Sequence, residues 1–543
     1  MNISMKEARK RGLRPAVILF PVLIFATLII IGLVDGKAFI GMLNTVFQSL
    51  MVNGSWFISL GTLISVIFMI FVFFHPIGKV KLGGKDAKPE FSMWNWFAIS
   101  LCSGIGTGIV FWGAVEPLKF AMEPQASLGI TPGSSTAVIW ALSKSYMQWS
   151  FAPYATYAIF GVVIAFAYFN LRKPYCVSSA FSPLLGQRAE KKWVRGVVDT
   201  LTVFAITGGV AGSLGYGLLQ IGSGLSTLFG MPLNNLTYSL ICLFIVVVYN
   251  ISSISGMKKG IKWLSDKNAW MFIILMVLAF VCGPAQWICN LFTESFGSFV
   301  STFVESITAV SPFTDAGTAA GSVWYESSGL WPQWWDQFAF VDYFAFAPIV
   351  GLFCIKLAKG RTIREFVLMN WFVPAMFGVL WFAVFGGLTL DIQFNFAAYA
   401  GRVDLQGCAT LYDYMLKFGN EAMMLKVIEV IPLASILKPI VLALIVLSFV
   451  TMADSMTSTV SLMTINRNED VEEAPAALKL MWGILMGVAA LVLTLTGNIE
   501  GIKMIKTIAG FPILLLGLIM IGMFVVYVLK KENKKTLQEM MDD

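Results

Sequence analysis

Residues 94–118 read WNWFAISLCSGIGTGIVFWGAVEPL, an apolar stretch of membrane-spanning length with glycines at every second position: Gly104, Gly106 and Gly108. Each glycine costs about 1 kcal/mol relative to alanine in a helix, so three of them favour local unwinding of the backbone. Close packing against a neighbouring helix is the alternative, but small residues that serve this purpose are typically four residues apart. The stretch therefore predicts a discontinuous membrane helix whose free backbone groups can face a ligand or an ion.

The composition of the whole chain places this stretch in an integral membrane protein. Of the 543 residues, 57% are hydrophobic and only 13% are charged, whereas a soluble domain carries about 25% charged residues. We expect an all-α fold with twelve transmembrane helices, because a span needs about 20 mostly apolar residues. The predicted spans are 16–35, 56–75, 94–118, 136–170, 197–224, 237–252, 269–293, 336–357, 367–390, 436–463, 476–497 and 505–529.

The distribution of basic residues predicts the orientation of these spans. Under the positive-inside rule, 29 of the 38 Lys and Arg residues fall on the side that holds both termini, and seven fall on the opposite side. Those seven include Lys503 and Lys506, which we assign to the outer side at the junction of the last two spans. Both termini are therefore predicted to be cytoplasmic, and the net charge of +7 implies no nucleic-acid partner.

Cysteine and histidine are too sparse and too scattered in this sequence to predict a metal centre. The seven cysteines form no CxxC pair, and His75 is the only histidine. We predict neither a metal site nor a cofactor, and we disfavour a membrane-embedded enzyme, which usually needs a histidine or metal cluster. A channel is a further alternative, and it should show rings of like residues around an oligomeric pore.

Acidic and aromatic residues within the spans mark candidate binding positions. An acid inside a membrane helix is costly and indicates function by default, which singles out Asp342 in span 336–357. A structural hydrogen bond is the alternative for this residue. Trp149, Tyr154 and Tyr157 have the ring character of an aromatic cage for a quaternary ammonium group, although ordinary packing explains such residues equally well.

Five motifs of the chain resemble those of the betaine/carnitine/choline transporter family. They are Gly104–Gly108, Phe111–Pro117, Trp149–Tyr157, Lys359–Thr362 and Thr451–Ser455. The resemblance implies a homotrimeric carrier of a small onium compound in the lipid bilayer of the bacterial plasma membrane, with an inverted-repeat fold similar to that of amino-acid transporters. The implied segments are a cytoplasmic N-terminus at 1–15, two peripheral helices at 16–93, five-helix repeats at 94–293 and 336–529, an outer loop at 294–335 and a cytoplasmic tail at 530–543.

The family's aromatic box maps only partly onto this chain. Trp149 and Tyr157 match it, and Tyr154 stands where the family usually has a tryptophan. Three further tryptophans of the family are replaced here, by Asp342, Tyr343 and Phe346. Together with the three glycines of the 104–108 break, these residues form the predicted substrate site. The carboxylate at position 342 would attract an ammonium group and repel a substrate carboxylate, which argues against glycine betaine itself.

The sodium positions of the family offer few oxygen ligands in this sequence. Sodium-coupled members resemble one another in using threonine hydroxyls on the fifth span, where this chain has Ile206 and Val210. A Thr–Ser pair on the tenth span corresponds to Thr451 and Met452, and a thioether is a poor ligand for a hard cation. We therefore predict sodium-independent exchange, with proton coupling through Asp342 as the second choice. A symporter with a weakened sodium site at Thr451 is the alternative.

Overall fold

The computed structural model describes residues 5–7, 12–104, 106–255, 258–310, 331–465, 473–530 and 533–542, and these residues are almost entirely helical. The longer helices are α2 (Pro15–Val34), α3 (Gly36–Phe74), α4 (Met93–Gly104), α7 (Ser135–Trp149), α8 (Phe151–Phe169), α10 (Lys192–Phe229), α11 (Asn235–Ser255), α12 (Lys258–Cys282), α13 (Ala285–Ser301), α15 (Phe338–Ala358), α17 (Val373–Phe394), α20 (Ala434–Met463) and α21 (Ala476–Leu529). The shorter ones are α5 (Gly106–Trp112), α6 (Glu116–Met122), α9 (Ser182–Leu185), α14 (Phe303–Thr308), α16 (Ile363–Val367), α18 (Leu411–Phe418), α19 (Met423–Val427) and α22 (Lys534–Asp542).

Ten helical segments in the described part of the chain are long and apolar enough to cross a membrane. They coincide with ten of the twelve predicted spans, so the all-α membrane fold is confirmed, while the count of twelve stays a prediction. The predicted span 94–118 is not one continuous helix, because α5 ends at Trp112 and α6 begins at Glu116. The predicted span 269–293 runs across a bend of 108° between α12 and α13, and this bent pair would make an eleventh span.

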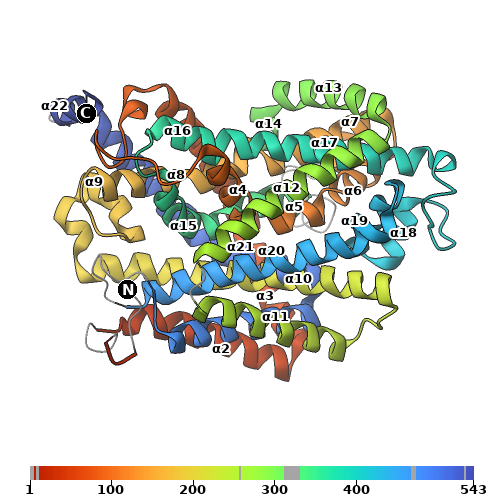
Figure 1. Cartoon of the computed structure of the whole chain (residues 1–543), viewed down its shortest axis with the longest axis horizontal. Coiled ribbons are helices and arrows are strands. Elements are labelled where there is room, and N and C mark those ends of the chain that lie inside the picture. Colours follow the sequence, from red (N-terminus) through yellow and green to blue (C-terminus); the bar gives the residue numbers. More distant parts are fainter. Residues whose placement is uncertain are drawn as a thin grey trace.

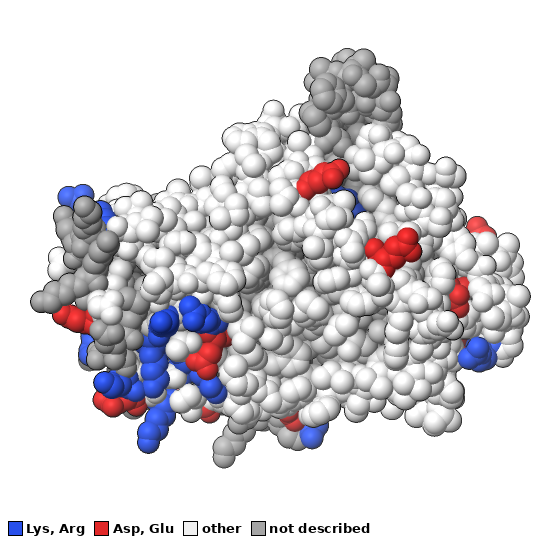
Figure 2. All heavy atoms as spheres, turned by 90° about the horizontal axis from the view of Figure 1, so that it is seen from above, with Lys and Arg blue, Asp and Glu red and all other residues white. Residues whose placement is uncertain are grey.

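The two ends of the chain lie at the same end of the molecule, beside α9 and α22 (Figure 1). Basic side chains gather at that end on the face seen from above, whereas the middle of this face is largely uncharged (Figure 2). The short helices α18 and α19 lie at the opposite end. This arrangement has the polarity that the basic-residue count predicts, and the assignment of one end to the cytoplasm stays a prediction.

Small residues on α10 allow it to pack closely along α21. A Cβ atom at Gly212 would lie 2.6 Å from Cδ of Lys506, and one at Gly215 would lie 2.7 Å from Cδ1 of Ile502. At these spacings an added methyl group would displace the facing side chain, so glycine favours the close approach of the two helices. The contact fixes the part of α21 that carries its two central lysines.

Those two lysines lie within a helix. Lys503 and Lys506 are not exposed loop residues, because both belong to helix α21. Their exposed fractions are only 3% and 4%. Two separate membrane-spanning segments lie here, Ala476–Thr496 and Ile499–Leu529, and both lysines belong to the second one with their side chains buried in the protein interior.

A second close approach brings α15 against α8. A Cβ at Gly351 would lie 2.9 Å from the backbone nitrogen of Gly161, so both helices need glycine where they cross. The crossing places Asp342 and Tyr343 of α15 near the aromatic residues of α8. Of the predicted outer loop, the first part forms the end of α13 and α14, while residues 311–330, including Trp324, lie outside the described residues.

Candidate substrate site

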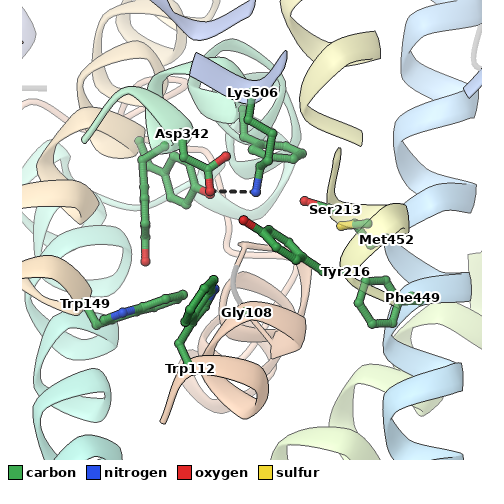
Figure 3. Close-up of a pocket in the computed structure, with 12 residues that line it drawn as sticks. Gly108, Trp112, Trp149, Ser213, Tyr216, Asp342, Phe449, Met452 and Lys506 are labelled. Atoms are coloured by element: carbon green, nitrogen blue, oxygen red, sulfur yellow. Dashed lines mark hydrogen bonds and ion pairs between the residues drawn. The ribbon is translucent and has the colours of Figure 1, made fainter. Parts of the chain in front are cut away.

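A buried cavity lies where α5, α7, α8, α10, α15, α20 and α21 meet, and Figure 3 shows it from inside the bundle. The space that the centres of water-sized molecules can occupy within it is about 40 Å³. The cavity combines aromatic, hydroxyl and charged side chains in an otherwise apolar interior. Its lining residues are Gly108, Trp112, Trp149, Tyr157, Ser213, Tyr216, Asp342, Tyr343, Phe346, Phe449, Met452 and Lys506.

Helix α5 contributes Gly108 and Trp112 to the wall of this cavity. The unwinding predicted around Gly104, Gly106 and Gly108 centres on Ile105, which lies outside the described residues. A Cβ atom at Gly108 would lie 2.8 Å from the Trp149 ring, so this glycine gives the indole room to lie against α5. Helix α5 and the Trp149 indole are therefore packed closely against each other.

Trp149 is held in a fixed orientation by two neighbours. Its Nε1 donates a hydrogen bond to Oε2 of buried Glu116 at 2.6 Å. Its ring stacks on Phe382 with a centroid separation of 5.5 Å and an interplanar angle of 27°. Buried Glu116 therefore positions the Trp149 ring.

Two tyrosines form the adjoining wall of the cavity. The rings of Tyr157 and Tyr343 are 4.5 Å apart, and the Trp149 ring meets Tyr343 edge-on at 6.2 Å. Tyr154 differs from them, because it lines a neighbouring cavity and touches the Tyr343 ring at 5.9 Å. Of the predicted cage, the structure therefore brings Trp149, Tyr157, Tyr343 and Phe346 to the main cavity, while Tyr154 supports them from behind.

Asp342 is not an isolated carboxylate in this cavity. Lys506 Nζ donates to its Oδ2 at 2.6 Å, and the ammonium lies 5.0 Å from the Tyr216 ring centroid and 5.7 Å from that of Phe346. A buried charge is strongly unfavourable unless it is paired, so each group stabilises the ionised form of the other here. Asp342 therefore has a counter-charge in Lys506 that the sequence interpretation did not include, and its effect on a substrate carboxylate stays a prediction.

Several polar atoms in the cavity have no hydrogen-bond partner within the described structure. They are Oδ1 of Asp342 and the hydroxyls of Tyr216 and Tyr343, all buried from solvent. Buried polar groups are normally hydrogen-bonded, so such atoms in a cavity are available to a ligand or to water. The cavity therefore offers both hydrogen-bond donors and an acceptor alongside its aromatic rings.

A second ammonium lies one helical turn away, among aromatic rings. Lys503 Nζ lies 3.6 Å from the Trp335 ring centroid and 5.4 Å from that of Trp112, and it donates to the Trp334 carbonyl at 3.2 Å. No ion pair joins it to a carboxylate among the residues that the structure describes. Trp112 lines the cavity and so separates it from this second lysine.

The predicted sodium positions hold few side-chain oxygens. Ile206 and Val210 are fully buried in α10. The Thr451 hydroxyl donates to the Leu447 carbonyl of its own helix at 2.7 Å, and Met452 rather than Thr451 lines the cavity. Within the described ranges, no three or more His, Cys, Asp or Glu side chains are grouped so that they could hold a metal ion.

Sequence reasoning missed the α10 and α21 side of the cavity, which Ser213, Tyr216 and Lys506 supply. One signal was available for the lysine: position 506 falls inside an apolar run, where a charge is as unusual as that at Asp342. No comparable signal marks Tyr216, because its ring reaches the cavity only through the packing of α10 against its neighbours.

Comparison with known proteins gives a consistent result over almost the whole chain. Residues 16–534 match the family described as BCCT, betaine/carnitine/choline family transporter. The glycine betaine transporter OpuD of Bacillus subtilis (strain 168) is 32% identical over 475 residues, which is 86% of this chain and 85% of that protein. The ectoine/hydroxyectoine transporter of Virgibacillus pantothenticus is 29% identical over 515 residues, which is 94% of this chain and 96% of that protein.

Among solved structures, a Na+-coupled sialic acid symporter in its substrate-bound outward-open state gives a TM-score of 0.41 at 14% identity. The superposition covers 90% of this chain and 87% of that chain. At that TM-score the likeness is too distant to bear on the site.

Proposed function

This chain belongs to the betaine/carnitine/choline family of transporters, and we propose that it exchanges small onium compounds across the bacterial plasma membrane without sodium. The observation that carries the proposal is the cavity wall formed by Trp149, Tyr157 and Tyr343. A cation over such rings gains about 0.5–2 kcal/mol per ring when it is desolvated. Three rings at one buried position therefore suit a trimethylammonium group or a related cation.

The composition of the site supports transport without sodium. A sodium ion needs several oxygen ligands to replace its hydration shell, and losing them costs several kcal/mol. Ile206 and Val210 offer no side-chain oxygen, and Met452 turns a thioether toward the cavity. The Lys506 ammonium already provides a fixed positive charge beside Asp342. Exchange is then the simplest cycle, because one substrate leaving can be replaced by another without a coupling ion.

Counterflow in proteoliposomes tests this proposal. Vesicles loaded with unlabelled glycine betaine should take up labelled glycine betaine with saturable kinetics, and replacing sodium by potassium on both sides should leave the rate unchanged. Strict dependence on an inward sodium gradient would overturn the sodium-independent mechanism. Absence of binding and counterflow for betaine, choline, carnitine, γ-butyrobetaine and ectoine would overturn the function itself.

Proton coupling is a second candidate, because Asp342 is a cavity carboxylate whose ion pair could be exchanged for a proton. It predicts that vesicles without internal substrate accumulate labelled substrate when an inward proton gradient is imposed. Under pure exchange such vesicles show no accumulation. We further propose a homotrimer with both termini in the cytoplasm, which mass measurement of the detergent-solubilised protein and labelling of terminal tags from each side test separately.

A further inference from the structure

We propose that Lys506 binds the carboxylate of a zwitterionic substrate, so that the Asp342–Lys506 pair selects onium compounds that carry a carboxylate over cations that lack one. This inference rests on the proposed function, because it assigns the part of the same site that binds the negatively charged end of the substrate. The aromatic wall takes the onium group, and the ammonium of Lys506 takes the opposite charge.

The first support is the unused hydrogen-bonding capacity of the ammonium. A lysine ammonium has three N–H donors, and the structure gives one of them to Oδ2 of Asp342. The nearby Tyr216 and Phe346 rings accept only weakly, so N–H donors of Lys506 remain for a ligand. A substrate carboxylate is the strongest acceptor that a small onium compound can bring to them.

The second support is the separation of the two poles within the cavity. In Figure 3 the side chains of Lys506, Tyr216 and Ser213 come from one side, whereas Trp149 and Trp112 lie across the cavity from the lysine. The Tyr216 hydroxyl is buried and has no partner, so it is a second donor at the lysine end. Donors at one end and ring faces at the other match a molecule with a carboxylate at one end and an onium group at the other.

The third support is the charge balance. Asp342 and Lys506 together are neutral, and their side chains are only 19% and 4% exposed. A zwitterion adds no net charge to this interior, whereas choline adds one positive charge that nothing in the pair compensates. An uncompensated charge in a buried site is strongly unfavourable. The neutral pair therefore favours the zwitterion, which a lone carboxylate at position 342 would not do.

The position of the lysine is also fixed by packing rather than left to a mobile side chain. The stem of Lys506 runs over Gly212, where an added Cβ would lie 2.6 Å from Cδ of the lysine. Helix α10 thus restricts the methylene groups of Lys506 and holds its ammonium in one position beside Asp342. A carboxylate anchor needs this kind of fixed donor, because ordering a free lysine side chain would cost binding energy.

Glycine betaine and choline are the probes that test the inference. Both carry a trimethylammonium group, and they differ in whether the other end is a carboxylate or a hydroxyl. We expect purified wild-type protein to bind glycine betaine more tightly than choline. Lys506→Met should shift the ratio of the two affinities toward choline by at least about tenfold, because Asp342 then carries an unpaired negative charge. Asp342→Asn should shift it toward glycine betaine, because Lys506 is then the unpaired charge.

Two further variants keep the test decisive if Lys506→Met does not fold. Lys506→Arg retains the positive charge and should retain the preference for glycine betaine. The double variant Asp342→Asn/Lys506→Met restores neutrality without an anchor, and its ratio should lie between those of the single variants. An unchanged ratio in Asp342→Asn and in a folded Lys506 variant that lacks the charge would overturn the inference. If the wild type still bound both probes, the proposed function would stand.

Discussion

Two lysines one turn apart on α21 show how differently this interior treats the same charged group. Lys506 meets the carboxylate of Asp342 at 2.6 Å and lines the cavity. Lys503 has four aromatic rings within 6 Å and donates to one carbonyl. The buried ammonium of Lys503 is thus surrounded by aromatic faces and one carbonyl in this structure. The carboxylate at Asp342 is what distinguishes the lysine at the cavity from the lysine behind it.

Replacing the two lysines should have its most different effect on the free energy of unfolding. Lys506→Met leaves Asp342 without a partner, and breaking a buried ion pair by removing one member costs about 3–5 kcal/mol. Lys503→Met removes a buried charge that has no carboxylate partner in the described structure, so we expect it to be neutral or stabilising. Thermal unfolding of the two variants in the same detergent measures the difference. Equal destabilisation would show that Lys503 has a counter-charge as important as Asp342.

Two tryptophans allow the next comparison. Trp149 lines the cavity together with Lys506, whereas Trp335 lies against Lys503. Trp149→Ala should weaken binding of glycine betaine by about 1–3 kcal/mol, since it removes a ring that faces the onium group. Trp335→Ala removes the ring that lies 3.6 Å from Lys503 and should leave affinity nearly unchanged. Isothermal titration of both variants checks this. Unchanged affinity in folded Trp149→Ala would remove that residue from the site.

Packing beneath Lys506 provides a weaker perturbation of the same region. Gly212→Ala places a methyl group against the lysine stem, and overpacking of this kind costs about 1–2 kcal/mol when the displaced chain can shift. We expect a matching loss of glycine betaine affinity, because the ammonium moves away from Asp342. Gly196→Ala on the same helix is the matched control, since nothing lies within 4 Å of an added Cβ there. Similar affinity losses in both variants would contradict the role given to Gly212.

Much of this site could be predicted from the sequence, and the missing part has a physical cause. Apolar runs of membrane length predicted all ten membrane-spanning helices that the described residues contain. The aromatic side chains of Trp149, Tyr157 and Tyr343 were predicted to line the site, and all three line the cavity. Charge alone indicated Asp342 but not its partner. Lys506 reaches the carboxylate because glycines of α10 let α21 approach, and such a long-range contact leaves no local pattern in the sequence. The charge count also placed both lysines among the outer-side residues, because their burial depends on contacts with distant helices.

The smallest effect is expected at a third lysine, which shows what an ion pair contributes in water. Lys359 Nζ lies 2.8 Å from Oε1 of Glu90, and the side chains are 48% and 55% exposed. The hydrogen bond and the charge of Glu90 raise the pKa of Lys359 above its usual value.

A group whose pKa rises on folding stabilises the protein below its unfolded pKa of about 10.4 and loses that contribution as the pH rises through the folded value. Exposed pairs contribute only about 0.2–1 kcal/mol. Lys359→Met should therefore lower the free energy of unfolding by no more than this at pH 7, and the difference from wild type should vanish at strongly alkaline pH. Paired thermal unfolding of variant and wild type across that range measures it. A loss at pH 7 as large as that of Lys506→Met would mean that burial is not what separates the cavity pair from a surface pair.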